Sequence, residues 1–142
     1  MRTAQVEPRA LSPVSDQAPA MQIGEAFVEA IVDGRFDTVQ RLFAPRARFR
    51  AITPGSVRQA TAARDARSVI EDWFGDTEHR QLLQSSVRIV ADRLVIDYCL
   101  RFREEGETRV AEQFGVAIVA NGRIADLWLV CSGFRPVFGT PT

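Results

Sequence analysis

The amino-acid sequence predicts an α+β protein in which N-terminal helices pack on one face of an antiparallel sheet. Apolar residues recur at helical spacing in three segments that all lie before residue 75. Beyond residue 79, four long segments with strand-like alternation follow one another, separated by short turns such as Asn121-Gly122. Helices gathered ahead of an antiparallel meander are typical of α+β domains.

The composition indicates one soluble globular domain behind a flexible arm. A chain of 142 residues with 46% hydrophobic and 25% charged residues can bury a sizeable core. Residues 1–20 contain three prolines among small, polar and charged residues and have no apolar period. They predict a flexible N-terminal arm. The domain is expected over residues 21–142.

Charge, cysteine and hydropathy patterns exclude several classes of protein. The formal net charge is zero, which argues against nucleic-acid binding. All 18 basic residues are arginine, which we attribute to a GC-rich, bacterial genome. No segment is apolar enough to cross a membrane or to act as a signal peptide, so we expect a cytoplasmic protein. Cys99 and Cys131 lie far apart and are expected to be free thiols. With His79 as the only histidine, we expect no metal site.

Two helices are predicted at the start of the domain. Residues 21–32 carry an apolar stripe at helical spacing, and Gly34 can end that helix in a left-handed conformation. Residues 36–43 predict a short second helix, with apolar residues at positions that face the first. Pro45 is expected to stop it.

A strand, a loop and a third helix follow. Residues 47–53 alternate as a strand with Phe49 on the apolar face. Residues 56–64 are polar and predict a loop. Residues 65–74 again show helical spacing, with Asp65 as the expected N-cap.

The remaining chain predicts a meander of four strands. The first two cover residues 80–90 and 93–103, and residues 104–107 form a charged hairpin loop between the second and third. The second strand is expected to turn one face to the core, made by Leu94, Ile96, Tyr98, Leu100 and Phe102.

The last two strands contain the candidate catalytic groups. Asn121-Gly122 favours a tight hairpin because both central residues of such a turn need positive φ. Alternation ahead of that turn places Glu112 on the predicted core face, together with Val110, Phe114, Val116 and Ile118. Glu112 then has two interpretations: an acid that binds or protonates a substrate, or a carboxylate in a salt bridge or at a pocket mouth. Tyr98 is the second candidate, as a phenolic donor facing the same space.

Two segments, FVEAIVDGRFDTVQRLFAPRARFRA at residues 27–51 and NGRIADLWLVCSGF at residues 121–134, resemble a known family. They are similar to the SnoaL-like branch of the nuclear transport factor 2 (NTF2)-like superfamily, and the resemblance covers residues 21–137. It implies a cystatin-like α+β cone barrel, in which a curved sheet wraps around the helices and encloses an apolar pocket. The family includes polyketide cyclases, ketosteroid isomerases, epoxide hydrolases, dehydratases and non-enzymes, and many members are dimers.

The resemblance excludes some of these reactions. Phe27 and Ala51 stand where ketosteroid isomerases carry a tyrosine and an aspartate base, and neither can move a proton. Leu129 stands at a position that limonene-type epoxide hydrolases need for water activation. Glu112 aligns with the acidic partner of the isomerase oxyanion hole and is the one such group that remains.

We therefore expect an enzyme of bacterial secondary metabolism that closes a ring in a large apolar, polyketide-like substrate, by aldol chemistry or cycloaddition. Glu112 and Tyr98 are the expected catalytic residues, and no cofactor is needed. The alternatives are a non-catalytic small-molecule-binding or dimerisation module, and a hydrolase or dehydratase with a pocket carboxylate. Trp128 has the parity of the outer sheet face and predicts a homodimer there. The expected substrate-binding residues are Phe27, Phe49, Trp73, Phe74, Phe114, Leu127, Leu129 and Cys131.

Overall fold

The computed structural model describes residues 17–137, and its elements follow the predicted order of helices first and strands second. The elements are α1 (Gln17–Asp33), α2 (Phe36–Leu42), β1 (Phe43–Thr53), β2 (Ser56–Ala60), α3 (Ala63–Phe74), β3 (Glu78–Val90), β4 (Arg93–Glu104), β5 (Glu107–Ala120), β6 (Arg123–Cys131) and β7 (Arg135–Pro136).

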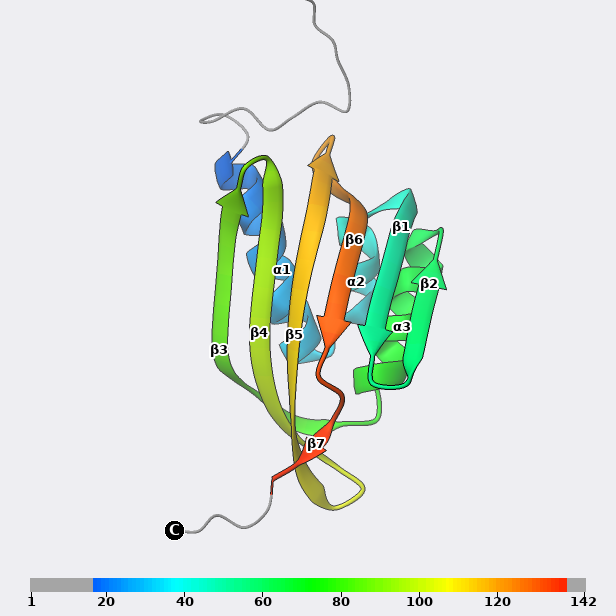
Figure 1. Ribbon diagram of the computed structural model, residues 1–142, viewed down its shortest axis with the longest axis vertical. Helices are drawn as coiled ribbons and strands as arrows, with labels where there is room; N and C mark the ends of the chain where they lie inside the picture. Colours follow the sequence, from blue (N-terminus) through cyan, green and yellow to red (C-terminus); the bar gives the residue numbers. More distant parts are fainter. Residues whose placement is uncertain (1–16, 138–142) are drawn as a thin grey trace, which may run out of the picture.

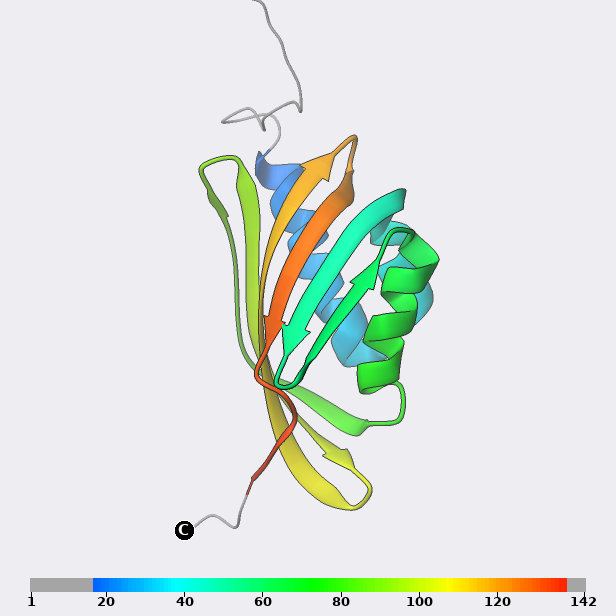
Figure 2. The same cartoon turned by 45° about the vertical axis from the view of Figure 1, so that its right-hand side comes forward.

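The strands form one curved, unclosed sheet, and the three helices pack against its concave face (Figures 1 and 2). The strand order is β2-β1-β6-β5-β4-β3, with β7 paired to β5. The sheet is antiparallel except for β1 and β6, which run parallel. The structure confirms the predicted α+β cone fold. Among the described residues, no helix is long and apolar enough to cross a membrane.

Helix α1 begins earlier than predicted and ends as predicted. It starts at Gln17, so assigning residues 17–20 to a flexible arm was wrong; the rest of that predicted arm, residues 1–16, lies outside the described residues. At the other end, Gly34 has a φ of +72° and donates its N–H to Ile31 at 3.2 Å, and Arg35 donates to Ala30 at 2.8 Å. This pair of hydrogen bonds is a Schellman motif, which favours glycine at the left-handed position.

Arg80 ties the ends of two helices to strand β3. Its Nε donates to the Val32 carbonyl of α1 at 3.0 Å, and its Nη1 donates to the Phe74 carbonyl of α3 at 3.2 Å. The same Nη1 lies 2.8 Å from the Thr77 carbonyl. Helix C-termini carry unpaired carbonyls and a partial negative charge, so one guanidinium satisfies both ends at once.

Three predicted boundaries were wrong around β1. The second helix ends at Leu42, because Phe43 already pairs with β6. Pro45 lies inside β1, where the pairing with β6 is irregular between Phe43 and Arg48; such irregular sites tolerate a residue without an N–H. The predicted loop at 56–64 contains β2, an exposed edge strand whose polar residues conceal the strand pattern.

Helix α3 also begins before the predicted N-cap. Its N-cap is Ala62, no side chain caps it, and Asp65 lies within the first turn. The carboxylate at Asp65 is still favourable there because the helix N-terminus carries a partial positive charge.

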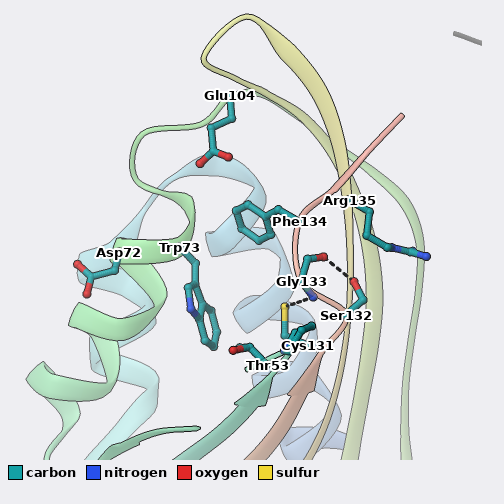
Figure 3. Close-up of a pocket in the computed structure, with 10 residues that line it drawn as sticks. Thr53, Asp72, Trp73, Glu104, Cys131, Ser132, Gly133, Phe134 and Arg135 are labelled. Atoms are coloured by element: carbon teal, nitrogen blue, oxygen red, sulfur yellow. Dashed lines mark hydrogen bonds between the residues drawn. The ribbon is translucent and has the colours of Figure 1, made fainter. Parts of the chain in front are cut away.

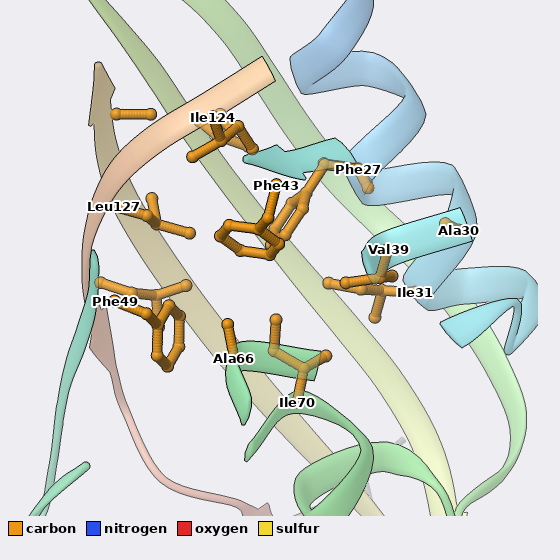
Figure 4. Packing of buried hydrophobic residues seen from close by; sticks show 14 of the residues in the cluster. Phe27, Ala30, Ile31, Val39, Phe43, Phe49, Ala66, Ile70, Ile124 and Leu127 are labelled. Carbon is orange, nitrogen blue, oxygen red and sulfur yellow. The ribbon is translucent and has the colours of Figure 1, made fainter. Parts of the chain in front are cut away.

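The core between sheet and helices combines aliphatic side chains with a series of aromatic rings (Figure 4). Phe27 lies edge-on to Phe43 at 6.1 Å between ring centroids, and Phe43 lies edge-on to Phe49 at 6.2 Å. Further rings continue towards one end of the molecule through Trp73 and Phe74. This packing leaves the open space at the end of the cone, beyond Phe74.

Candidate functional site

Strand β5 turns the opposite face to the core from the one predicted. The Glu112 side chain is 62% exposed, and its Oε1 accepts a hydrogen bond from Arg135 Nη2 at 3.1 Å. Phe114 is also exposed. The predicted placement of Glu112 on the core face is therefore wrong, and the salt-bridge interpretation describes it. The residues of β5 that face inward are Ala111, Gln113, Gly115, Ala117 and Val119.

A β-bulge in β6 matches that strand to the inner face of β5. Next to the Asn121-Gly122 turn, Val119 pairs with Ile124, but the next pair joins Ile118 to Asp126. Ala125 is thus an extra residue in β6. Because side chains alternate with a period of two, this residue turns β6 over beyond Ile124, so that Leu127 and Leu129 lie opposite the small residues Ala117 and Gly115 of β5.

The orientation of β5 brings an unpredicted polar chain into the core. Tyr98 faces inward as predicted, and its hydroxyl donates a hydrogen bond to Gln113 Oε1. Gln113 Nε2 in turn donates to Cys131 Sγ at 3.2 Å. All three side chains are buried. Burial raises the pKa of the Tyr98 phenol well above its ordinary value, and the neighbouring Cys131 adds to the rise.

An open cavity of about 590 Å³ lies at the end of the cone, where β1, β6 and α3 all end (Figure 3). We call it the Trp73 cavity. Figure 3 shows Trp73 and Phe134 on its walls, Glu104 on one side, and Cys131 with Thr53 on the other. Its lining consists of Thr53, Pro54, Asp72, Trp73, Glu104, Cys131, Ser132, Gly133, Phe134 and Arg135.

The aromatic walls are held by the core beneath them. Phe134 packs on Phe102 at 4.7 Å and on Phe74 at 5.3 Å between ring centroids. The chain reaches this position through Gly133, which has a φ of +83° that favours glycine. An ideal Cβ at Gly133 would also lie 3.1 Å from the Pro54 ring, so the backbone at Gly133 packs closely against Pro54 in the cavity wall.

Glu104 is the carboxylate that lies on the inward face beside these rings. Its Oε1 is 3.3 Å from Arg109 Nε, and Arg109 also donates to Glu107 at 2.8 Å. The Glu104 side chain is only 27% exposed, whereas Asp72, the other acid on the lining, is 64% exposed and paired with Arg58. Of the two carboxylates on the lining, Glu104 is thus the better shielded from water.

The predicted lining residues separate into three groups. Trp73 and Cys131 lie on the cavity. Phe114 lies on the outer sheet face, since the predicted core face of β5 is the exposed one. The others are buried in the core below the cavity and do not line it: Phe27, Phe49, Phe74, Leu127 and Leu129.

The sequence reasoning missed Gln113, Glu104 and Phe134. Two signals could have revealed the first two. The core-facing alternation that runs from Leu94 to Phe102 reaches Glu104 after one more step. In the hairpin closed at Glu105-Gly106, Gln113 lies opposite Tyr98, and directly opposed residues share a face. Among residues 17–137, no group of three or more His, Cys, Asp or Glu residues could hold a metal ion.

No protein-family model and no curated protein sequence matches the chain. Solved structures do resemble it. A protein of Xanthomonas campestris pv. campestris, provisionally named a polyketide cyclase, matches with a TM-score of 0.66 at 18% identity, covering 82% of this chain and 92% of that one. An NTF-2-like protein of unknown function from Burkholderia xenovorans LB400 matches with a TM-score of 0.61 at 14% identity, covering 87% and 88%. The chain has the NTF2-like fold.

A third matching structure is an LEH-like epoxide hydrolase from M. tuberculosis, with a TM-score of 0.63 at 15% identity, covering 82% of this chain and 84% of that one. The resemblance to SnoaL-like and NTF2-like proteins seen in the sequence is thereby confirmed as a fold. Since one NTF2-like fold carries unrelated reactions, the reaction of this protein has to be argued from the Trp73 cavity.

Proposed function

We propose that the protein is an enzyme of the cyclase or isomerase type that folds an apolar carbonyl substrate, such as a polyketide chain, in the Trp73 cavity. One observation carries the proposal: aromatic walls face a single well-shielded carboxylate, Glu104, across an open cavity of about 590 Å³. That volume suits an organic ligand of moderate size. The fold shared with a provisionally named polyketide cyclase supports the choice of substrate class.

In the proposed reaction, Glu104 is a general base. Its carboxylate removes a proton from a carbon next to a carbonyl of the substrate, and the resulting enolate carbon attacks a second carbonyl of the same chain. A carbon–carbon bond forms, and the proton held by Glu104 returns to the new alkoxide. Arg109 forms an ion pair with the carboxylate, with its Nε 3.3 Å from Oε1. The step consumes no cofactor.

The aromatic walls supply the second part of the mechanism. A flexible chain with several carbonyls has many conformations, and few bring the reacting carbons together. Trp73 and Phe134 can hold the chain in a folded form, and such positioning can lower a barrier by up to about 7–11 kcal/mol. We expect the cavity to contribute more through shape than through ionisable groups.

A matched pair of variants tests this proposal. Wild type, Glu104→Gln and Glu112→Gln are incubated with a synthetic poly-β-ketone thioester, and the cyclised product is measured by mass spectrometry. Loss of a general base should slow ring closure by about 10²–10⁴-fold in Glu104→Gln. Glu112→Gln should keep the wild-type rate, because that side chain lies on the outer face. Equal rates in all three proteins would contradict the assignment of Glu104.

Ligand binding distinguishes the alternatives. The chain has two tryptophans, so a Trp128→Phe background leaves Trp73 as the only indole reporter at the cavity. Quenching of Trp73 fluorescence without any product would favour a non-catalytic binding module. Conversion of an apolar epoxide to a diol that depends on Glu104 would favour a hydrolase, with the carboxylate activating water.

We also propose that a second copy of the chain covers the outer sheet face. Trp128 is 43% exposed there, beside Val116, and the neighbouring row joins Ile52, Val130 and Phe114 across three strands. An apolar patch with mixed charges around it suits a two-fold interface, in which each copy presents the same surface. The surrounding charges have both signs: Arg50, Arg101, Asp97 and Glu112.

A further inference from the structure

A second cavity, of about 400 Å³, lies at the opposite end of the molecule from the Trp73 cavity. Strands β1 and β6 and helix α3 all begin beside it and end at the Trp73 cavity. The length of β6 separates the two by roughly 26 Å, at about 3.3 Å per residue. We call this second cavity the arginine pocket. Its lining consists of Gln40, Arg41, Phe43, Pro45, Ala62, Ala63, Arg64 and Arg123.

The charge of the arginine pocket is one-sided. Three arginine residues lie on its lining, and no acidic residue does. Within residues 17–137, Arg41 and Arg123 make no salt bridge, and Arg64 has only a contact at 4.0 Å with Asp65. Most other arginines of the described chain are paired with a carboxylate, for example Arg67 with Glu71 at 3.1 Å. All three arginines are exposed, so an anion can reach them from solvent, and their like charge attracts it.

Helix α3 adds to this positive potential. Its first turn borders the arginine pocket, and its N-cap, Ala62, has no side chain that could accept a hydrogen bond. Arg64 stands in this turn, although the positive end of a helix dipole disfavours cations. Arg67 Nη1 donates to Gln40 Oε1 at 3.3 Å, which leaves the N–H donors of the Gln40 amide free for another partner. The side chains of the lining therefore supply cations and amide donors.

The remaining lining is apolar. Besides Gln40 and the arginines, the lining residues are Phe43, Pro45, Ala62 and Ala63, of which Pro45 is exposed. An inorganic anion alone would leave this surface and most of the volume empty. A ligand that carries both an anionic head and an organic body would use all of it.

We propose that the arginine pocket binds a small organic phosphate. The phosphate dianion would lie among Arg41, Arg64 and Arg123, where planar guanidinium groups can form paired hydrogen bonds to its oxygens. The organic group would contact Pro45 and Ala62. This site is independent of the proposed reaction at Glu104 and holds whether or not the Trp73 cavity is catalytic.

Calorimetric titration of the full-length protein with phenyl phosphate tests the proposal. We expect Arg41→Gln and Arg123→Gln each to weaken binding by about 10-fold or more, the usual value for a lost charge-assisted hydrogen bond. Arg101→Gln is the matched control, since Arg101 lies on the outer face and is bonded to Gln81; it should bind as wild type does. Neither Arg41 nor Arg123 holds an ion pair in the described chain, and thermal unfolding checks that both variants fold.

Three further ligands define the chemical class. Inorganic phosphate should bind more weakly than phenyl phosphate, because it lacks the apolar body. Benzoate and benzenesulfonate should bind more weakly as well, because they carry a single charge. The proposal is overturned if the wild-type protein binds none of the four ligands. It is also overturned if benzoate, benzenesulfonate or inorganic phosphate binds as tightly as phenyl phosphate. Unchanged binding in both Arg41→Gln and Arg123→Gln would also overturn it.

Discussion

Removing the Tyr98 hydroxyl should destabilise the folded protein, although Tyr98→Phe deletes a single oxygen atom. In the wild type that hydroxyl donates to Gln113 Oε1, and Gln113 is 3% exposed. The phenylalanine variant leaves the amide oxygen buried without a donor. An unsatisfied buried acceptor costs about 1–3 kcal/mol. For a domain of this size, the loss corresponds to a fall in the melting temperature of roughly 3–10 °C.

Chemical denaturation with a double-mutant cycle measures this cost. Tyr98→Phe combined with Gln113→Met removes both partners, and we expect the double variant to be more stable than the sum of the two single changes predicts. Cys131 loses its amide donor in both Gln113 variants, so that weaker hydrogen bond cancels in the cycle. Strict additivity of the two substitutions would refute the claim that the Tyr98–Gln113 bond stabilises the core.

Alkaline pH provides a second measurement on the same residue. Burial raises the pKa of Tyr98, so above about pH 10 the unfolded chain loses a proton that the folded chain keeps. Stability must then fall as pH rises, by up to about 1.4 kcal/mol per pH unit, and full stability is present below pH 10. Tyr98→Phe lacks this term, so the stability gap between the two proteins should narrow above pH 10.

Tyr98 is the only tyrosine in the chain, so the ultraviolet absorbance of tyrosinate reports this residue alone. We expect the tyrosinate signal to appear together with unfolding rather than before it. A reversible titration near pH 10 in the folded protein would show that the phenol is accessible, and would refute the buried hydrogen-bonded arrangement.

Two further predictions concern the Arg80 hydrogen bonds to the helix C-termini and the outer sheet face. Arg80→Met removes the donors that satisfy carbonyls of α1 and α3, and should lower the free energy of unfolding by about 2–4 kcal/mol in urea denaturation; an unchanged midpoint would contradict its role. Trp128→Arg should convert a dimer to a monomer in sedimentation velocity, because it buries an unpaired charge in the proposed interface. Val90→Arg, an exposed apolar residue at the end of β3, is its control and should leave the sedimentation unchanged.

The sequence predicted the features of the fold that depend on neighbouring residues. The Gly34 helix end and the tight turn at Asn121-Gly122 are confirmed, since each needs positive φ at residues that adopt it readily. Strand β2 was missed because an exposed edge strand has no apolar face to alternate. The N-terminal boundary of α3 was missed because no capping side chain marks Ala62.

The candidate site was predicted less well, because residue size misleads in β5. The larger residues of that strand, such as Phe114 and Val116, lie on or near the outer face, and the inner face is lined by small ones. Gly115 shows the cause: an ideal Cβ there would lie 3.0 Å from Leu127 Cδ1. Rings from the helices and neighbouring strands already fill the interior, so β5 must contribute little volume. The alternation of apolar residues in a single sequence reports hydrophobicity only. It cannot show how much interior volume the other elements leave for the side chains of β5.

The extra residue at Ala125 has a consequence for comparing this protein with others of its fold. An alignment anchored on the Asn121-Gly122 turn and continued without a gap along β6 will match the inner residues of β6 here with outer residues of a relative that lacks the bulge. Leu127 would then be equated with a surface position, and Trp128 with an inner one. Superposed coordinates, rather than aligned letters, are needed to decide which residues of β6 correspond. Deletion of Ala125 is therefore a one-residue change that should exchange the two faces of β6 beyond Ile124.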